Sequence, residues 1–262
     1  MSIFEPTVEL TEKLRKLGLS GIIETIVVRN QEALSNQLPY CEFLSLLLQD
    51  ELMARENRSY IRRLAVSNLK GHKSLENFDF KFNPKINQVL IRDLVTCRFI
   101  REKYPVIIIG PCGTGKSHIA HSIGLCAIRS GFDVLCTSHT ELSQMLQTAR
   151  AIGNYKKKLH SLSKVSVLII DDFGLKPLQT PQDEDLHELI AARYETTATI
   201  VTSNLALHEW QQAFPNQLLG AACIDRLQHN AYVLILDGVS YRANCKNGKM
   251  QDDNMENKRT VI

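Results

Sequence analysis

The feature that most constrains this chain is residues 110–117, which spell GPCGTGKS and fit the pattern G-x-x-x-x-G-K-S of a phosphate-binding loop. Four apolar, strand-favouring residues precede it at 106–109, and apolar side chains at helical spacing follow it over 118–129. A strand, a glycine-rich turn and a helix in this order surround an anion with backbone N–H groups and the positive end of a helix dipole. The stretch predicts binding of a nucleoside triphosphate. A glycine-rich connection without chemistry is the alternative.

Two side chains of this loop have separate expected roles. Lys116 would reach the β- and γ-phosphates, and the Ser117 hydroxyl would help to hold Mg²⁺. The residues expected to line the ATP site are Gly110, Pro111, Cys112, Gly113, Thr114, Gly115, Lys116, Ser117 and His118.

Composition places the chain among ordinary globular proteins. Of its 262 residues, 44% are hydrophobic and 23% are charged. No apolar run approaches the roughly 18 residues that a membrane span needs, and the N-terminus does not resemble a secretory signal. The cysteines are scattered without a C-x-x-C pair, which favours a reducing compartment and argues against structural zinc. We therefore expect a cytoplasmic protein that makes no membrane contact.

The N-terminal part of the chain is predicted to be helical. Apolar residues recur every three or four positions through residues 7–65, with interruptions near Gly18 and Gly21 and at Pro39. We expect a small all-helical domain at 1–68 and a linker at 69–87. Phe78, Phe80 and Phe82 would form a short extended piece of that linker, and core packing is favoured over a base-stacking platform.

From residue 88 onward, the pattern predicts a doubly wound α/β domain. A helix is expected at 86–102, and strand signals at 106–109, 134–137, 165–170, 198–202 and 232–236 alternate with helical ones. This alternation predicts a parallel sheet with helices on both faces, the fold class of P-loop NTPases. The domain would span 88–243, with a polar, disordered tail at 244–262 and no C-terminal helical lid.

Polar residues after three apolar segments are the candidate catalytic groups. Asp171 and Asp172 follow a strand that is apolar enough to be buried on both faces. Asp171 would hold Mg²⁺, usually through water, and Asp172 would orient or deprotonate the attacking water. Asn204, after the next strand, could sense the γ-phosphate or hold that water. A turn or a helix cap is the alternative role for all three. Arg226 follows a further apolar segment and, without other information, would be a surface arginine.

A basic cluster lies before the phosphate loop. The net charge is only +3, but six basic residues between positions 55 and 73 accompany one acid, Glu56. Such a cluster suits contact with the DNA backbone, and a solvated helix face is an equal alternative. Residues 156–158, three lysines, form a second group for which a solvated loop is favoured. The candidate DNA-binding residues are Arg55, Arg58, Arg62, Arg63, Lys70 and Lys73.

Taken together, residues 8–243 resemble the IstB-like helper ATPases of insertion sequences, relatives of the DnaC helicase loaders within the AAA+ superfamily. The blocks that carry the resemblance are LRKLGLSG at 14–21, FLSLLLQDEL at 43–52, RENR at 55–58, LENFDF at 75–80, GPCGTGKSH at 110–118, IDDFG at 170–174, RYE at 193–195, TSN at 202–204, DRL at 225–227 and SYR at 240–242.

The resemblance implies roles that the pattern alone does not give. Lys116 and Ser117 would belong to Walker A, Asp171 and Asp172 to Walker B, and Asn204 to sensor I. Arg226 would be an arginine finger acting on a neighbouring subunit, and Arg242 the sensor II arginine. The family implies a homo-oligomer that assembles on double-stranded DNA with ATP and engages its cognate transposase. Cys112, where a second proline is commoner, departs from the family pattern.

Three functions remain open from the sequence. The first is a DNA-binding ATPase that helps a transposase, with slow, Mg-dependent hydrolysis stimulated by DNA and assembly. The second is a DnaC-like loader of a replicative helicase, which would act on single-stranded DNA. The third is a nucleotide-gated DNA scaffold with little hydrolysis, which the short side chain of Asp172 would allow. A small-molecule kinase is the weakest fit, because no acceptor-substrate motif is apparent.

Overall fold

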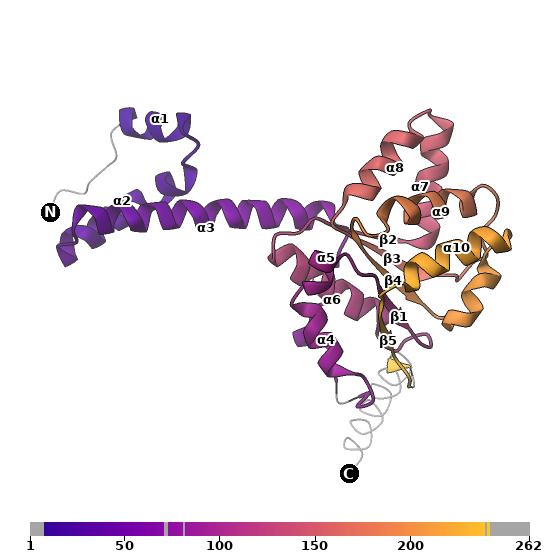
Figure 1. The fold of residues 1–262 in the computed structure, drawn as a ribbon. Coiled ribbons are helices and arrows are strands. Elements are labelled where there is room, and N and C mark those ends of the chain that lie inside the picture. Colours follow the sequence, from indigo (N-terminus) through magenta and orange to yellow (C-terminus); the bar gives the residue numbers. More distant parts are fainter. Residues whose placement is uncertain (1–7, 71–72, 81, 239, 242–262) are drawn as a thin grey trace, which may run out of the picture. The chain divides into compact units, whose positions relative to one another are not determined.

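The computed structural model describes residues 8–70, 73–80, 82–238 and 240–241 (Figure 1). It divides the chain into two compact units, Met1–Arg63 and Leu64–Ile262. Helix α3 crosses the boundary in sequence. No helix of the described ranges is long and apolar enough to cross a membrane.

From residue 8 onward, where the structure describes the first unit, it contains three helices, as the apolar spacing predicts. They are α1 (Val8–Lys16), α2 (Ser20–Asn36) and α3 (Tyr40–Val66). Its small core consists of Ile22, Ile26 and Leu47, with partly buried apolar neighbours such as Phe43. Gly21 permits close packing of α2 on α3, because a Cβ there would lie 2.7 Å from the Cβ of Ala54.

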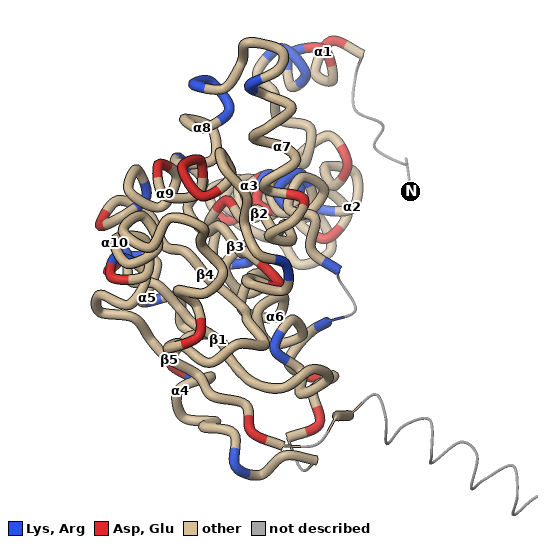
Figure 2. The backbone as a smooth tube through the Cα atoms, turned by 90° about the vertical axis from the view of Figure 1, so that its right-hand side faces the viewer, with Lys and Arg blue, Asp and Glu red and all other residues tan. Residues whose placement is uncertain are grey.

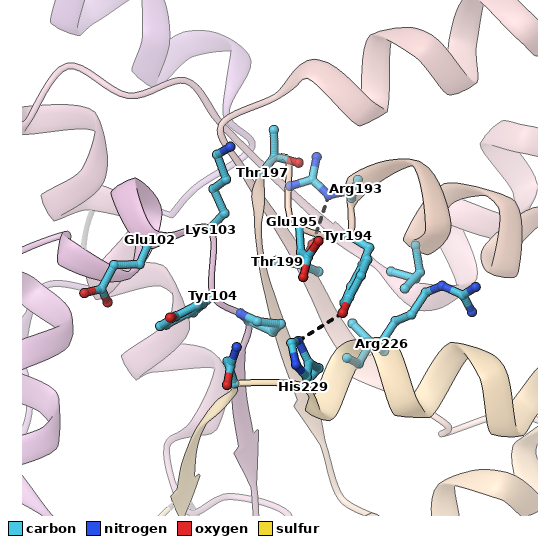
Figure 3. A pocket seen from close by; sticks show the side chains of 14 residues that line it. Glu102, Lys103, Tyr104, Arg193, Tyr194, Glu195, Thr197, Thr199, Arg226 and His229 are labelled. Carbon is cyan, nitrogen blue, oxygen red and sulfur yellow. Dashed lines mark hydrogen bonds between the residues drawn. The ribbon is translucent and has the colours of Figure 1, made fainter.

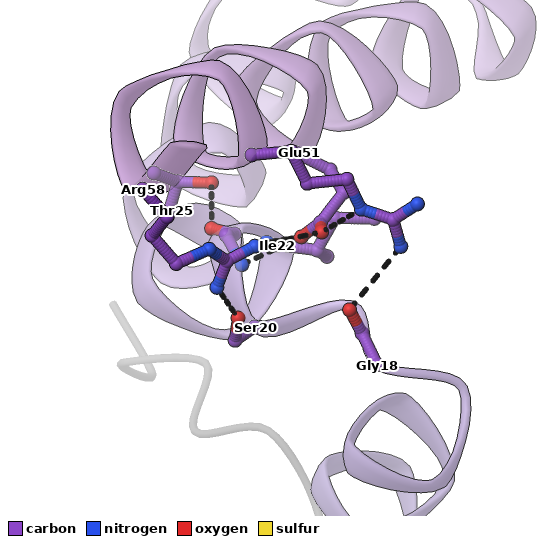
Figure 4. A network of polar contacts seen from close by, with 8 residues as sticks. Gly18, Ser20, Ile22, Thr25, Glu51 and Arg58 are labelled. Atoms are coloured by element: carbon purple, nitrogen blue, oxygen red, sulfur yellow. Dashed lines mark hydrogen bonds and ion pairs between the residues drawn. The ribbon is translucent and has the colours of Figure 1, made fainter. Parts of the chain in front are cut away.

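A buried carboxylate joins α2 to α3 in this unit (Figure 4). Glu51, only 3% exposed, accepts hydrogen bonds from the N–H groups of Gly21 (2.6 Å) and Ile22 (3.3 Å) in the first turn of α2. Arg55 (2.7 Å) and Arg58 (3.2 Å) form ion pairs with the other carboxylate oxygen. The carboxylate thus caps α2 from outside that helix, where its negative charge also suits the helix dipole.

These contacts set the pH dependence of the first unit. Burial alone raises the pKa of Glu51, but the bonds from Arg55, Gly21 and Ile22 outweigh it and hold the pKa below its usual value. Because folding lowers this pKa, the stabilisation is complete above the pKa of an exposed glutamate, about 4.3. It is lost as the pH falls through the lower pKa of the folded state.

We predict that Glu51→Gln will loosen the start of α2. Its amide keeps one acceptor but loses the charge that holds both arginines, which should lower the free energy of local unfolding by about 1–3 kcal/mol at pH 7. Hydrogen exchange at the amides of Gly21 and Ile22 measures this directly. Glu56→Gln, an exposed acid of the same helix, is the matched control and should leave both amides protected. Equal protection in Glu51→Gln would show that the carboxylate is not the cap.

The second unit is built on a five-stranded parallel sheet with the order β2-β3-β4-β1-β5. Ile109 of β1 lies opposite Ser203 of β4 and Ile235 of β5. The carboxyl ends of these strands therefore lie along one edge of the sheet. The strands are β1 (Val106–Ile109), β2 (Val134–Ser138), β3 (Val167–Phe173), β4 (Ala198–Ser203) and β5 (Tyr232–Ile235).

Helices cover both faces of this sheet, as the sequence predicts (Figure 1). On one face lie α4 (Gln88–Val95), α5 (Arg98–Glu102) and α6 (Lys116–Arg129). On the other lie α7 (His139–Ala151), α8 (Tyr155–Lys164), α9 (Gln182–Arg193) and α10 (Gln217–Gln228). Short 3₁₀ helices occur at η1 (Leu75–Asn77) and η2 (Leu207–Ala213). A continuous apolar core joins alternate residues of β1, β3 and β4 to α7–α10.

Several local predictions were wrong. The expected helix at 86–102 is broken at Cys97, whose φ of 62° ends α4 and precedes α5. The lysines at 156–158 lie on α8 rather than on a loop, and Figure 2 shows this basic helix. The expected tail at 244–262 lies outside the described residues.

Candidate functional site

The phosphate-loop motif forms the turn between β1 and α6. Gly110 takes a φ of 151° and donates its N–H to the Ser203 carbonyl (3.2 Å), which ties the start of the loop to β4. A Cβ at this position would lie 2.2 Å from the Leu236 carbonyl oxygen, so only glycine fits between β4 and the end of β5. Gly115, with a φ of 99°, is the N-cap of α6. The loop thus leads into a helix N-terminus that can bind an anion.

Lys116 is the first residue of α6 and is 5% exposed. Its Nζ donates to the Pro111 carbonyl (2.9 Å), and the Thr114 hydroxyl donates to the same oxygen (2.9 Å). The ammonium is therefore held across the loop, where it lines a pocket together with Gly113 and Ser117. This position suits contact with phosphate oxygens.

Asp171 meets the loop from the neighbouring strand. Its Oδ1 accepts hydrogen bonds from the Ser117 hydroxyl (2.9 Å) and from the Thr202 hydroxyl of β4. A serine hydroxyl beside a carboxylate is an oxygen donor pair of the kind that Mg²⁺ prefers, because this ion usually keeps several of its waters. The two expected metal-binding residues, Ser117 and Asp171, therefore fit that ion.

Asp172 occupies an unusual backbone conformation beside Asp171. Both residues lie in the last part of β3 rather than after it, and Asp172 has a φ of 56°. Its N–H donates to the Thr202 hydroxyl (3.0 Å), so this one hydroxyl fixes both acids. A non-glycine residue in this region is strained, and such strain is common at functional sites. Asp172 and Asn204 both line the pocket.

The sequence did not indicate that the Thr202 hydroxyl would hold both acids in place. The available signal was a fully buried strand that ends in polar side chains next to an acid-bearing strand. We predict that Thr202→Val, a change of nearly equal shape, will leave the Asp172 N–H without its acceptor and Asp171 without one donor. Mg-dependent ATP affinity should fall about tenfold, which is within the cost of one unsatisfied buried group.

Titration with ATP in the presence and absence of Mg²⁺ measures this effect. Thr137→Val is the control, because it also removes a buried threonine hydroxyl from a strand, but one that contacts the Ser138 carbonyl (3.3 Å) instead of Asp171. An unchanged Mg²⁺ dependence in Thr202→Val would contradict the role of this hydroxyl.

Three aromatic residues also line this pocket, which has a volume of about 380 Å³. Phe78 covers Gly115 so closely that a Cβ there would lie 2.6 Å from the phenyl ring. Phe82 packs edge-on against Tyr241, with ring centroids 5.0 Å apart. Core packing was favoured for Phe80 and Phe82, whereas Phe82 lines the pocket together with Phe78. The flat apolar rings beside the phosphate loop offer a surface on which a nucleotide base could stack.

The segment between η1 and α3 lies along α6. The Cys136 N–H donates to the Ser67 carbonyl (2.8 Å), the Lys70 N–H to His121 Nδ1 (3.1 Å), and the Ser122 hydroxyl to the Lys73 carbonyl (2.9 Å). Burial lowers the pKa of His121 to about 4, so its neutral ring can accept that bond. Lys73, one of the candidate DNA-binding residues, also lines this pocket.

His118 contacts this same segment. Its Nε2 lies 2.7 Å from the Ser74 carbonyl, and its ring packs on Phe78 with centroids 5.4 Å apart. Cys112 is exposed at the rim of the pocket. Arg242 lies outside the described residues.

Arg226 does not line this pocket. It borders a second cavity of about 280 Å³, together with Pro105, Thr197 and Asn230, which lie just before β1, β4 and β5 (Figure 3). This second cavity is therefore at the amino ends of the parallel strands, opposite to the phosphate loop. The structure brings Lys116, Ser117, Asp171, Asp172 and Asn204 together and separates Arg226 from them.

The parallel sheet, the phosphate loop and the acid pair at the end of β3 define a P-loop NTPase of the AAA+ type. More particularly, the chain belongs to the family described as IstB-like ATP binding protein, which matches residues 12–248. It is 33% identical over 250 residues to a protein of Mycobacterium tuberculosis named as an ATP-binding protein in an insertion sequence, covering 95% of this chain and 99% of that one. It is 34% identical to the ATP-binding protein of insertion sequence IS21 from Pseudomonas aeruginosa, covering 89% of this chain and 87% of the relative.

Solved structures support the fold assignment. The replication initiator DnaA bound to AMPPCP and single-stranded DNA aligns with a TM-score of 0.56 and 18% identity, covering 72% of this chain and 57% of that one. The DnaC helicase loader aligns with a TM-score of 0.50 and 22% identity, covering 56% of this chain and 86% of the loader. At these identities the likeness concerns the fold alone. The chain thus belongs to the IstB-like ATP-binding family, and the relatives from Mycobacterium tuberculosis and Pseudomonas aeruginosa are named as ATP-binding proteins of insertion sequences.

Proposed function

We propose that this chain is an ATP-dependent DNA-binding helper of an insertion-sequence transposase, which assembles on duplex DNA and hydrolyses ATP between neighbouring subunits. The family and its insertion-sequence relatives support the transposition context. Hydrolysis between subunits is inferred from one observation: within a single chain, Arg226 is separated from the phosphate loop.

The residues of the nucleotide pocket have distinct tasks in this proposal. Lys116 and the loop N–H groups bind the phosphates, while Ser117 and Asp171 hold Mg²⁺, which supplies charge neutralisation at the β- and γ-phosphates. Asp172, fixed by Thr202, accepts a proton from the attacking water. Asn204 lies at the end of the adjacent strand and orients that water. With these roles, the chain is a Mg-dependent ATPase.

Distance explains why Arg226 would act on a neighbour. The two cavities lie at opposite ends of strands such as β1, whose four residues alone span about 13 Å. An arginine side chain cannot reach the phosphate loop of its own chain over that path. An arginine placed against a second subunit's γ-phosphate stabilises the negative charge of the transition state, which makes hydrolysis depend on assembly.

The candidate DNA-binding residues differ in whether they are already ion-paired within the chain. Arg55 and Arg58 are ion-paired with buried Glu51, and Arg58 also donates to Ser20. Arg62 is exposed and Arg63 is half-buried farther along α3. Arg63 also donates to the Ser59 hydroxyl (2.9 Å). We therefore assign the DNA-backbone contact to Arg62 and Arg63 before Arg55 and Arg58, because those two would have to leave the buried Glu51 carboxylate to bind a phosphate.

We predict that Arg226→Ala will abolish DNA-stimulated hydrolysis, lowering turnover by about a thousandfold or more, while ATP affinity remains nearly intact. Turnover and ATP binding are measured with saturating duplex DNA, with single-stranded DNA and without DNA. Arg129→Ala, an exposed arginine at the end of α6, should leave the stimulated rate unchanged.

Three results would redirect the proposal. Unchanged turnover in Arg226→Ala would exclude the arginine from catalysis. Stimulation of the unaltered chain by single strands alone would favour the helicase loader. An absence of turnover with intact ATP binding would favour the scaffold.

For DNA binding, we predict that the double change Arg62→Gln and Arg63→Gln will weaken affinity equally across duplex sequences. The plot of log affinity against log salt should become shallower by about 0.9 for each phosphate contact removed. Fluorescence anisotropy over a salt series with ATP present gives both values. The matched control changes Lys156 and Lys157 on α8 to glutamine, and a shallower slope in the control alone would move the DNA contact to α8.

A further inference from the structure

The cavity beside Arg226 contains an arrangement that no assigned role explains (Figure 3). Arg226 lies in the last turn of α10, which ends at Gln228. Its guanidinium donates to the Ala222 carbonyl of the same helix (2.7 Å), and Figure 3 shows the side chain pointing away from His229. The direction in which Arg226 can extend is therefore set by where the last turn of α10 lies. Helix ends fray unless something holds them.

Two residues hold this end: Leu227, which is buried in the core, and the residue that caps the helix. His229 is the C-cap of α10, and its N–H donates to the Asp225 carbonyl (2.9 Å). Its ring Nδ1 lies 3.0 Å from the Tyr194 hydroxyl, and the two ring centroids are 5.6 Å apart. Tyr194 is itself the C-cap of α9. A side-chain hydrogen bond thus joins the ends of two helices directly.

The α9 side of this bond is firmly anchored. Arg193, which precedes Tyr194, is 1% exposed. It donates to the Thr199 hydroxyl (2.9 Å), to the carbonyls of Leu162 (2.7 Å) and Val165 (3.0 Å), and to the Ala198 carbonyl. Burial lowers its pKa to about 9, so the guanidinium remains charged and a five-fold donor at neutral pH. These bonds fix the end of α9 to the start of β4 and to the end of α8.

We propose that Tyr194 is a positioning residue for Arg226. The tyrosine hydroxyl, anchored through Arg193, fixes His229 and with it the last turn of α10, so that Arg226 is presented to the neighbouring subunit in one geometry. This inference rests on the proposed hydrolysis between subunits and adds to it the residue pair that sets the arginine's place. Small misplacements of a catalytic group cost about a hundredfold in rate, so removing the pair should have a large effect.

Mixed oligomers test this inference. One subunit type carries Asp172→Asn, which retains ATP binding and supplies Arg226 but lacks the catalytic acid. The other carries Arg226→Ala, which hydrolyses only if a neighbour supplies its arginine. Mixing the two full chains with ATP and duplex DNA should restore part of the turnover that each lacks alone. Tyr194→Phe is then added to one type at a time.

We predict that Tyr194→Phe in the arginine-supplying subunit will lower the restored kcat about tenfold, with the KM for ATP unchanged. The same change in the subunit that hydrolyses ATP should have no effect, because that subunit's arginine is already absent. A general loss of folding would instead lower turnover from either position. Tyr232→Phe is the matched control, since it removes another tyrosine hydroxyl near this cavity that bonds to Glu102 (3.1 Å) and not to α10.

The results of these mixing experiments distinguish hydrolysis between subunits from the positioning role of Tyr194. No restored turnover in the unaltered mixture would overturn hydrolysis between subunits, and the positioning role with it. Restored turnover that is equally high with Tyr194→Phe in the supplying subunit would overturn the positioning role alone. Equal losses from both positions would show that Tyr194 serves folding only and would also overturn it.

Discussion

The parallel pairing of β1, β3 and β4 is the constraint on which the rest of the structure depends. Ile109 lies opposite Ser203, and Ile170 opposite Val201, so the chain leaves all three strands at one edge of the sheet. A one-residue slip in any of them would turn its buried side chains to the other face. The phosphate loop and Asn204 follow β1 and β4 directly, and the acid pair lies in the last part of β3. Their meeting in one pocket is thus a consequence of strand register, without a separate set of contacts.

This explains why so much of the site could be predicted from sequence. The phosphate loop needs only a strand before it and a helix after it, and both signals are local. The acids follow a strand of nearly pure apolar residues, and a parallel sheet then dictates where they lie. The backbone conformation of the acids could not be predicted from the sequence. That Asp172 would lie inside β3 with a φ of 56°, held by Thr202, depends on a contact between two strands 30 residues apart.

Contacts between distant segments account for the predictions that failed or were too coarse. The basic cluster was taken to begin at Arg55, which leaves out Glu51, four residues earlier and on the same face of α3. The four-residue spacing of Glu51 and Arg55 would have indicated their ion pair. It would not have indicated how deeply α2 buries the Glu51 carboxylate. Core packing was expected for Phe80 and Phe82, yet Phe82 is half-buried and lines the pocket, and only the fold shows that Phe78 covers Gly115 of the phosphate loop. The Tyr194–His229 pair, 35 residues apart, has no local signal at all.

The exposure of that pair bears on how assembly and hydrolysis could be coupled. In a single subunit, water competes for the Tyr194 hydroxyl and the His229 ring, so their bond contributes little net stability. A neighbouring subunit that engages Arg226 would cover the adjacent surface and exclude that water, and a hydrogen bond in a drier environment is electrostatically stronger. Under the proposed function, the geometry of Arg226 would therefore become firm when a neighbour is present. Assembly would then supply both the arginine and the conditions that hold it in place.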